Sequence, residues 1–284
     1  MNNEKWNEWF AGLTDGDGCF YINKKEQSVS FELTTHVSDS RVVYDIKNKL
    51  KFGSVKMRSN CQAIRYRVKA KPAILDIVSR LNGKLYNPVR VQQLIQVCTL
   101  YEIQYVPSLP FPELSYAYLA GIIDSDGTIS ISTSKSSAQH SQLSGVHGKI
   151  TRLINAKGSN QIALKVTTIY EDYAKFIRNV AGFGTIYVEK PRKPFRTLDE
   201  NTKSDKVQCN IKNRNTKYHW TIRSQEDFQS LYNQCRLKSV KMHRIRLALL
   251  YFQYKDLGYH LKPAETLEAK IWGKFAKSWY KYSY

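Results

Sequence analysis

A nine-residue pattern occurs twice in this chain, as FAGLTDGDG at residues 10–18 and as LAGIIDSDG at residues 119–127. Each copy follows aromatic residues and is followed by a stretch in which apolar and other residues alternate. The equivalent aspartates Asp17 and Asp126 are 109 residues apart. The repeat indicates a duplicated unit, so we expect a fold built from two similar halves.

Each copy has the pattern of a buried helix that ends where a strand begins. The apolar run suits a buried helix, and Gly18 and Gly127 can end it because glycine tolerates the backbone angles of a helix terminus. The alternation after each glycine has the period of a strand. The Ala-Gly pairs at residues 11–12 and 120–121 leave room for close contact of two backbones. We therefore expect the two helices to pack against each other.

Asp17 and Asp126 would then lie in an unfavourable place. A helix C-terminus carries partial negative charge, and two carboxylates brought together repel each other and raise at least one pKa. A divalent cation would relieve both effects. A single Asp-Gly-Asp-Gly is more often an ordinary cap and turn, but its repetition in the same context favours a metal site. An EF-hand is excluded, because its twelfth residue would be Lys24 or Thr133 instead of glutamate.

The charge balance indicates a polyanionic partner. The chain has 284 residues with 44 Lys and Arg, 24 Asp and Glu, and a net charge of +20. Nucleic acid is the leading candidate. A membrane partner is disfavoured, because no apolar segment is long enough to span a bilayer, and the polar start is unlike a signal or transit peptide. Scattered cysteines and histidines without zinc spacing favour a reducing compartment and a fold without structural zinc.

Prolines mark the boundary between the halves. Pro107, Pro110 and Pro112 follow a helix-like run at 89–103 and predict an extended linker. We assign the domains as residues 1–104 and 114–284, joined by a linker at 105–113. The second domain has two additional stretches, 134–157 and 190–215, without helical or strand periodicity. Both are predicted to be long loops, either disordered or extending a nucleic-acid footprint.

Several predicted strands place apolar residues on one face and polar or basic residues on the other, as in IRYRVK at 64–69 and YHWTIR at 218–223. Such polar residues pair with base edges and phosphates of DNA. The candidates in the first unit are Tyr21, Asn23, Lys25, Ser30, Glu32, Thr34, Lys56, Arg58, Arg65, Arg67 and Lys69. Those in the second unit are Thr128, Ser130, Ser132, Lys165, Thr167, Tyr187, Glu189, His219, Thr221 and Arg223. Because the two rows differ, the recognised site should be non-palindromic.

The last part of the chain is predicted to form a helix after Pro263, with Ile271, Trp272, Phe275 and Trp279 on one side. These aromatic residues are expected to dock on the second domain. The alternative is that they stack on bases of a single strand.

The two nonapeptides resemble the paired signatures of the LAGLIDADG homing endonucleases, in the single-chain, two-motif form encoded by group I introns of organelles. The resemblance covers nearly the whole chain. It implies an α/β (α+β) fold of two αββαββα units related by a pseudo-twofold axis, whose antiparallel sheets form a saddle over DNA. It also implies a monomeric, site-specific endonuclease that cuts both strands of a long asymmetric duplex and leaves short 3′ overhangs.

The same resemblance implies the site residues. Asp17 and Asp126 would bind Mg²⁺ together with the backbone carbonyls of Gly16 and Ser125. Two or three ions are expected, with Mn²⁺ as a substitute and Ca²⁺ binding without cleavage. The first aspartates of the motifs, Asp15 and Asp124, would tie the helix ends to neighbouring backbone.

Relatives often place a basic residue near the start of the last helix of each unit. Lys238, in CRLKSVK, matches this position in the second unit, and is the expected catalytic lysine. The first unit has Pro88 there, so that Lys84 or Arg90 would substitute, or one half-site would be cut more slowly. Thr35 and Thr168 would be the polar residues that organise water.

Another function within the same family remains open. Some relatives are RNA maturases that assist splicing of their host intron, so intron RNA is an alternative partner. Regulatory relatives that have lost the acidic residues are a poorer match, because both aspartates are present. The resemblance implies a location in a mitochondrion or chloroplast.

Overall fold

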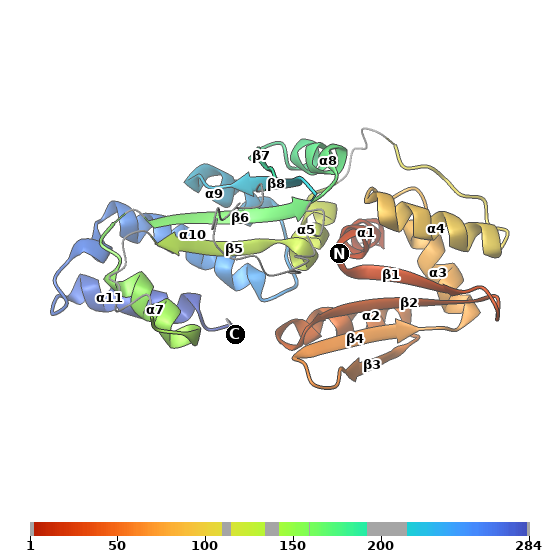
Figure 1. The fold of residues 1–284 in the computed structure, drawn as a ribbon, viewed down its shortest axis with the longest axis horizontal. Helices are drawn as coiled ribbons and strands as arrows, with labels where there is room; N and C mark the ends of the chain where they lie inside the picture. Colours follow the sequence, from red (N-terminus) through yellow and green to blue (C-terminus); the bar gives the residue numbers. More distant parts are fainter. Residues whose placement is uncertain (1–2, 110–114, 134–141, 159, 192–214, 283–284) are drawn as a thin grey trace, which may run out of the picture.

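Two four-stranded antiparallel sheets, one in each half of the chain, form the framework of the computed structural model (Figure 1). The structure describes residues 3–109, 115–133, 142–158, 160–191 and 215–282. The first sheet has the order β1-β2-β4-β3 and the second β5-β6-β8-β7. The strands are β1 (Gly18–Asn23), β2 (Ser28–His36), β3 (Ser54–Met57), β4 (Ala63–Val68), β5 (Thr128–Thr133), β6 (Asn160–Thr168), β7 (Thr185–Glu189) and β8 (Lys217–Ile222). The predicted duplication is therefore confirmed.

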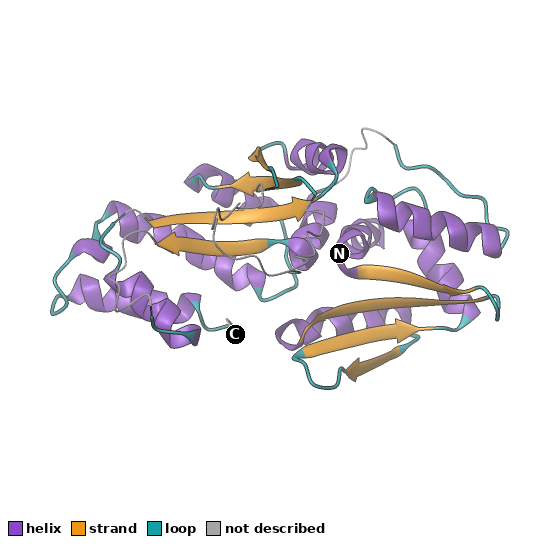
Figure 2. Cartoon of the chain, viewed as in Figure 1, coloured by secondary structure: helices purple, strands orange, loops and turns teal. Residues whose placement is uncertain are grey.

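Both halves combine helices with their sheet (Figure 2), and the second half has additional helices. The first half contains α1 (Asn3–Asp17), the 3-10 turn η1 (Val37–Asp39), α2 (Ser40–Leu50), α3 (Lys71–Leu81) and α4 (Pro88–Leu100). The second half contains α5 (Tyr116–Asp126), α7 (Gly145–Asn155), α8 (Glu171–Ala181), α9 (Gln225–Gln234), α10 (Lys241–Asp256), η2 (Tyr259–Leu261) and α11 (Leu267–Trp279). Within the described ranges, the first unit thus has two α-helices after its fourth strand and the second has three, where the expected order has one. Among the described residues, no helix combines the length and apolar character needed to cross a membrane.

One predicted loop is in part a helix. Residues 145–155, within the stretch 134–157, form α7, and its Leu153 is fully buried. Gly145 and Gly148 obscured the helical period in the sequence, because glycine is a poor helix former. Residues 134–141, most of the stretch 190–215 and residues 110–113 of the predicted linker lie outside the described part of the chain. The final helix is confirmed as α11, with Trp272, Phe275 and Trp279 buried, as docking requires.

Helices α1 and α5 pack directly against each other at the junction of the two units (Figure 1). A methyl group at Gly12 would collide with the carbonyl oxygen of Tyr118, and one at Gly121 would collide with that of Trp9. Both aromatic side chains are fully buried. The Ala-Gly pairs therefore allow the close backbone contact that the sequence predicted.

The alternation of the strands is also confirmed. Apolar residues such as Phe31 and Tyr66 pack into the core, and the registers pair Glu32 with Arg67 and Tyr21 with Ser30 on the other face. We call this second face the open face of the sheet, and the equivalent surface of the second sheet has the same parity. Each open face presents the predicted polar row on three or four neighbouring strands.

The contact between α1 and α5 leads to a prediction about stability. Gly121→Ala should lower the free energy of unfolding by about 1–3 kcal/mol, because the added methyl group forces two helix backbones apart. The matched control is Gly273→Ala in α11, where the nearest atom would be 4.0 Å away. That change should be neutral or stabilising by up to about 1 kcal/mol, because alanine favours the helix. Urea denaturation measures both, and equal effects would contradict the interpretation.

Candidate active site at the paired helix ends

Asp17 and Asp126 are the last residues of α1 and α5, and the helix contact brings them together. A Cβ atom at Gly16 would lie 3.0 Å from Oδ2 of Asp126, so the ends of the two helices nearly touch. Burial, and then the charge of Asp126, raise the pKa of Asp17 to about 6. Burial also raises the pKa of Asp126. A cation close to the pair would therefore stabilise the charged form of both carboxylates.

Two basic side chains already lie at these helix ends. Lys241 Nζ donates hydrogen bonds to the carbonyl oxygens of Ile123, Asp124 and Ser125 at 2.9, 2.8 and 2.7 Å. In the other unit, Arg90 Nη2 donates to the carbonyl oxygen of Gly16 at 3.1 Å. Both positive charges lower the pKa values of the two motif aspartates, against the effect of burial.

These cations come from equivalent places. Lys241 is the first residue of α10, and Arg90 lies in the first turn of α4, the helix that holds the same position in the first unit. Each places its charge at the negative end of the motif helix of its own unit, which is the favourable location for a cation. The negative end of the motif helix is thus offset by a lysine in the second unit and by an arginine in the first.

Asp39 is a third carboxylate near the pair, and the sequence did not identify it as such. It stands at the N-cap position of α2, but its side chain makes no capping hydrogen bond. Oδ1 of Asp39 instead accepts a hydrogen bond from the backbone N–H of Val240 at 2.7 Å. Burial raises the pKa of Asp39, and its charge contributes to the raised pKa of Asp17. Asp39 therefore links the first unit to the start of α10.

The first aspartates of the motifs tie the helix ends to neighbouring segments. Oδ2 of Asp15 accepts hydrogen bonds from the Tyr118 hydroxyl at 2.5 Å and the Tyr86 N–H at 2.8 Å. Asp124 accepts from the indole N–H of Trp9 at 2.9 Å and from the backbone N–H groups of Lys238 and Ser239. These contacts match the role expected for both aspartates. Burial raises the pKa of Asp15 to about 7.

The side chain of Lys238 does not point to the paired aspartates. Its Nζ forms an ion pair with Asp45 at 2.8 Å and lies 3.9 Å from the centre of the Trp9 ring. Trp9 precedes Asp17 by eight residues, which is about 12 Å along a helix. Lys241, three residues later in the same KSVK segment, is the basic residue that contacts the end of α5. Matching by position predicted Lys238, but Lys241 makes this contact.

In the first unit, the structure distinguishes between the two substitutes for a basic residue at Pro88. Lys84 forms an ion pair with Glu4 at 3.2 Å. Arg90 reaches the end of α1. Pro88 itself is the first residue of α4, where a missing N–H is harmless.

The paired helix ends fit Mg²⁺. Among the described residues, no group of three or more His, Cys, Asp or Glu side chains could hold a metal ion. Mg²⁺ does not need such a group, because it keeps several waters and is usually held by one or two carboxylates together with substrate phosphates. Asp17 and Asp126 supply two carboxylates whose raised pKa values indicate an unmet need for positive charge. The carbonyls of Gly16 and Ser125 are adjacent and retain a second lone pair each.

On the open face of the first sheet, the predicted residues form a connected row. Glu32 lies between Arg65 and Arg67, at 3.0 and 2.7 Å from their guanidinium groups. Tyr21 is exposed beside them. The predicted Lys25, Arg58 and Lys69 follow the ends of β1, β3 and β4, and lie outside the strands. Asn23, Thr34 and Lys56 share the face with them, but Ser30 is buried there.

The open face of the second sheet is more self-contained. His219 is hydrogen-bonded to Thr167 at 2.8 Å and to Glu189 at 3.1 Å, so these three predicted contact residues bind one another. Thr221 is only 2% exposed, because it lies on a central strand between Lys165 and Thr185. It does not fit a direct base contact. Exposed predicted residues on this sheet are Ser130, Ser132 and Tyr187, and Lys165 is half-buried. Arg223 is exposed and follows the end of β8.

Comparison with known proteins agrees with this geometry. The family model described as LAGLIDADG endonuclease matches residues 10–93. Over 280 residues, 97% of this chain, the sequence is 29% identical to the "Probable intron-encoded endonuclease aI2" of Debaryomyces hansenii. Over 281 residues, 98% of this chain, it is 29% identical to the "Intron-encoded RNA maturase bI4" of Saccharomyces cerevisiae. The chain spans 38% and 37% of the lengths of these two relatives.

The fold also matches a solved structure. The crystal structure of the LAGLIDADG homing endonuclease I-LtrWI bound to target DNA superimposes with a TM-score of 0.62, covering 99% of this chain and 98% of that one at 16% identity. The molecule is thus a pseudo-symmetric protein of two sheet-and-helix units with an acidic residue at the end of each central helix. It is similar to the LAGLIDADG homing endonucleases, in the single-chain form with two motifs.

The cation contacts lead to a prediction that separates the two lysines. Lys241→Met should lower the free energy of unfolding by about 3 kcal/mol, because it leaves the buried carboxylates of Asp39 and Asp124 without a neutralising charge. Lys238→Met removes one partly exposed ion pair and should cost about 1 kcal/mol or less. Added Mg²⁺ should raise the melting temperature of the Lys241→Met protein more than that of the wild type. Equal losses for the two variants, measured by urea denaturation, would contradict this assignment.

Proposed function

We propose that this protein is a metal-dependent, site-specific endonuclease that cuts both strands of a long asymmetric DNA duplex. The observation that carries the proposal is the meeting of Asp17 and Asp126 at the ends of two closely packed helices, between two sheets with polar open faces. The net charge of +20 supports a duplex partner. Relatives named as intron-encoded endonucleases support the reaction.

In this proposal, each motif aspartate serves one strand. Asp17 and Asp126, with the carbonyls of Gly16 and Ser125, would hold Mg²⁺. The bound metal would supply an activated water and stabilise the leaving oxygen. The residues of the chain provide the setting for this chemistry: the helix contact fixes the separation of the two carboxylates, and Asp15 and Asp124 fix the helix ends. Short 3′ overhangs are the expected product.

Arg90 and Lys241 would act at the same place through their charge. Each lies at one motif helix end and is partly buried, so that its charge acts more strongly on nearby anions than it would in water. A scissile phosphate brought to the aspartates adds negative charge, which these two cations would offset. This proposal replaces Lys238 with Lys241 as the basic residue of the second half-site and gives Arg90 the equivalent role in the first.

The open faces would read the target. Arg65, Arg67 and Lys56 in the first sheet differ from the hydrogen-bonded set of His219, Thr167 and Glu189 in the second. Different rows on two related sheets would recognise different half-sites, so we expect a non-palindromic target bound by a monomer. Since Thr221 and Ser30 are buried, neither is included among the base contacts in this proposal.

A second candidate function is supported by one relative. The yeast protein named as an RNA maturase is 29% identical over 98% of this chain. Intron RNA would then be the partner, and splicing assistance would not require Asp17 or Asp126. Asp17→Asn protein that still promotes splicing of its intron would support this function. The intron-encoded relatives also support the proposed organellar location, in a mitochondrion or chloroplast.

The aspartates provide the main test. Asp17→Asn or Asp126→Asn should reduce the cleavage rate at least about 1,000-fold, because a metal ligand is lost. Binding in Ca²⁺ should persist or tighten, because a negative charge near the phosphates is removed. Asp172→Asn, an exposed change on α8, is the matched control and should leave both unchanged.

The measurement starts from a randomised duplex library cut by the wild type in Mg²⁺, which yields the target site. Each variant is then tested on that site in Mg²⁺ and in Ca²⁺. Cleavage by an Asp17→Asn, Asp126→Asn double variant at the wild-type rate would exclude the proposed site. Binding without cutting by the wild type would favour the maturase function.

Arg67 tests the open face. Arg67→Ala should weaken binding to the selected site by about 1–3 kcal/mol and relax specificity at one position, if the guanidinium reads a base. The matched control is Arg178→Ala, which removes an exposed arginine from α8. Binding by fluorescence anisotropy against substituted sites gives both quantities. An unchanged affinity and base preference would remove Arg67 from the recognition surface.

A further inference from the structure

The second unit contains two helices that the first unit lacks. In the first unit, β1 and β2 are joined by the short turn at residues 24–27, whereas the connection between β5 and β6 contains α7. Helix α11 follows α10 and also has no equivalent. The two additional helices pack together, and the indole N–H of Trp272 donates a hydrogen bond to the carbonyl oxygen of Leu153 at 3.2 Å. Both lie below β5 in Figure 1.

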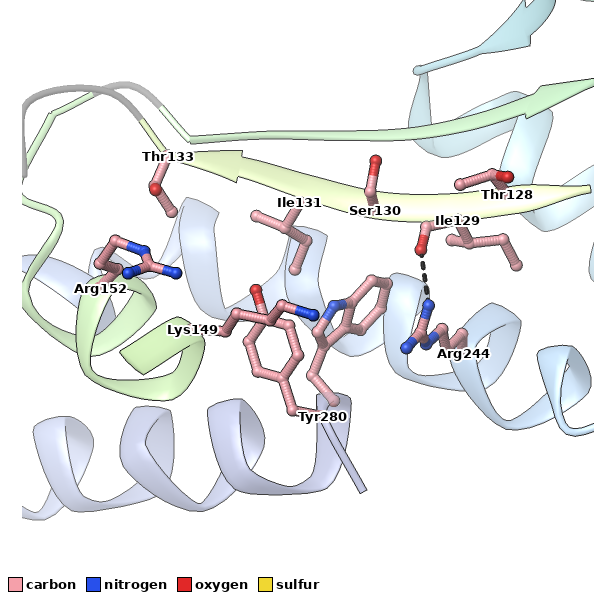
Figure 3. A pocket seen from close by; sticks show the side chains of 10 residues that line it. Thr128, Ile129, Ser130, Ile131, Thr133, Lys149, Arg152, Arg244 and Tyr280 are labelled. Carbon is pink, nitrogen blue, oxygen red and sulfur yellow. Dashed lines mark hydrogen bonds between the residues drawn. The ribbon is translucent and has the colours of Figure 1, made fainter. Parts of the chain in front are cut away.

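These helices and β5 enclose a cavity of about 320 Å³. Its basic lining consists of Lys149 and Arg152 from α7 and Arg244 from α10, and Tyr280 follows α11. Figure 3 shows these four side chains on one side of β5, with Arg152, Lys149 and Tyr280 close together. The described residues that line the cavity include no aspartate or glutamate. Three positive charges around one opening favour an anionic ligand.

The cationic groups are held in place. Nη1 of Arg244 donates a hydrogen bond to the carbonyl oxygen of Ile129 at 3.0 Å, and its guanidinium lies 5.8 Å from the centre of the Trp279 ring. Nη1 of Arg152 donates to the carbonyl oxygen of Leu143 at 2.6 Å. Each guanidinium has five N–H donors, so a fixed arginine can still bind a phosphate oxygen. Positioned guanidinium groups are well suited to phosphate because they match its geometry.

The location of the cavity favours DNA over a free anion. Strand β5 is the outer strand of its sheet, and the cavity wraps around its unpaired edge. Thr128 and Ser130 belong to the open face and also line the cavity, and in Figure 3 Ser130 points to the side of the strand opposite Lys149 and Arg152. The phosphate backbone of a duplex bound on the open face would therefore lie at the mouth of the cavity.

We propose that this cavity binds a backbone phosphate of the DNA target outside the base pairs that the second sheet contacts. This inference rests on the proposed function, which supplies the duplex. It makes the footprint longer on the C-terminal half-site than on the N-terminal one, because α7 and α11 have no counterpart in the first unit. The contact positions the duplex and carries no sequence information.

The test removes two of the cations from α7, away from the core. Lys149→Ala/Arg152→Ala should weaken binding of the selected duplex about tenfold or more at low salt. The slope of log affinity against log salt should become shallower by about 1–2, because fewer counterions are released. The matched control is Lys270→Ala/Lys274→Ala, which removes two exposed charges from the α11 surface outside the cavity lining. Thermal unfolding verifies that both variants are folded.

A second measurement locates the phosphate. Neutral methylphosphonates are placed one at a time along each strand of the duplex. The wild type should lose affinity at one or two positions flanking the C-terminal half-site, and the Lys149→Ala/Arg152→Ala protein should show no additional loss there. The mirrored positions of the N-terminal half-site should not respond in this way. Unchanged affinity and salt slope in the α7 variant, or equal losses in the control, would overturn the proposal.

The outcomes separate this inference from the proposed function. If the wild type binds duplex DNA but does not cut it, the endonuclease function fails, and the salt slope on a mixed-sequence duplex still decides the role of the cavity. If the α7 variant loses affinity for the intron RNA and none for the duplex, the cavity binds RNA instead and the DNA assignment is wrong. If the wild type binds no duplex at all, both proposals are rejected.

Discussion

The close contact between α1 and α5 is the constraint on which the rest of the structure depends. Gly12 and Gly121 bring the helix backbones together, and this places two negative helix ends and two carboxylates at one point. Such an arrangement raises the pKa values of Asp17 and Asp126, and it is stable only with compensating positive charge. Arg90 and Lys241 supply that charge from the helices that start beside each motif. A site that attracts cations is thus a consequence of how the two units are joined.

The motif assigns different tasks to its two aspartates through their place on the helix. Residues two apart on a helix point in different directions. Asp15 therefore faces Tyr118 and the start of α4, and Asp124 faces Trp9 and the start of α10, whereas Asp17 and Asp126 face each other. Hydrogen bonds from neighbouring groups hold the first pair. Within the part of the chain that the structure describes, the second pair has no equivalent donors and is left to interact with cations.

The sequence was sufficient for features that depend on local pattern. The repeated motif predicted the helix contact and the paired aspartates, and alternation predicted which strand residues share a face, because burial follows the period of a strand. It was insufficient for contacts that depend on the three-dimensional path of the chain. Lys238 and Lys241 lie in one KSVK segment, and only the path of the chain into α10 determines which of them reaches α5. Asp39 approaches the site through Val240, 201 residues away, and α7 was hidden by its glycines.

The two units also show which parts of a duplicated fold can diverge. The motif helices, the strand order and the starts of α4 and α10 are equivalent in both halves, because each contributes to one shared junction where a change in one half is felt by the other. The open faces and the additions α7 and α11 lie away from that junction. Arg65 and Arg67 share one carboxylate in the first sheet, whereas His219 binds Thr167 and Glu189 in the second. Each surface was free to acquire its own polar groups, so a symmetric frame can carry an asymmetric binding surface without weakening the contact that holds the aspartates together.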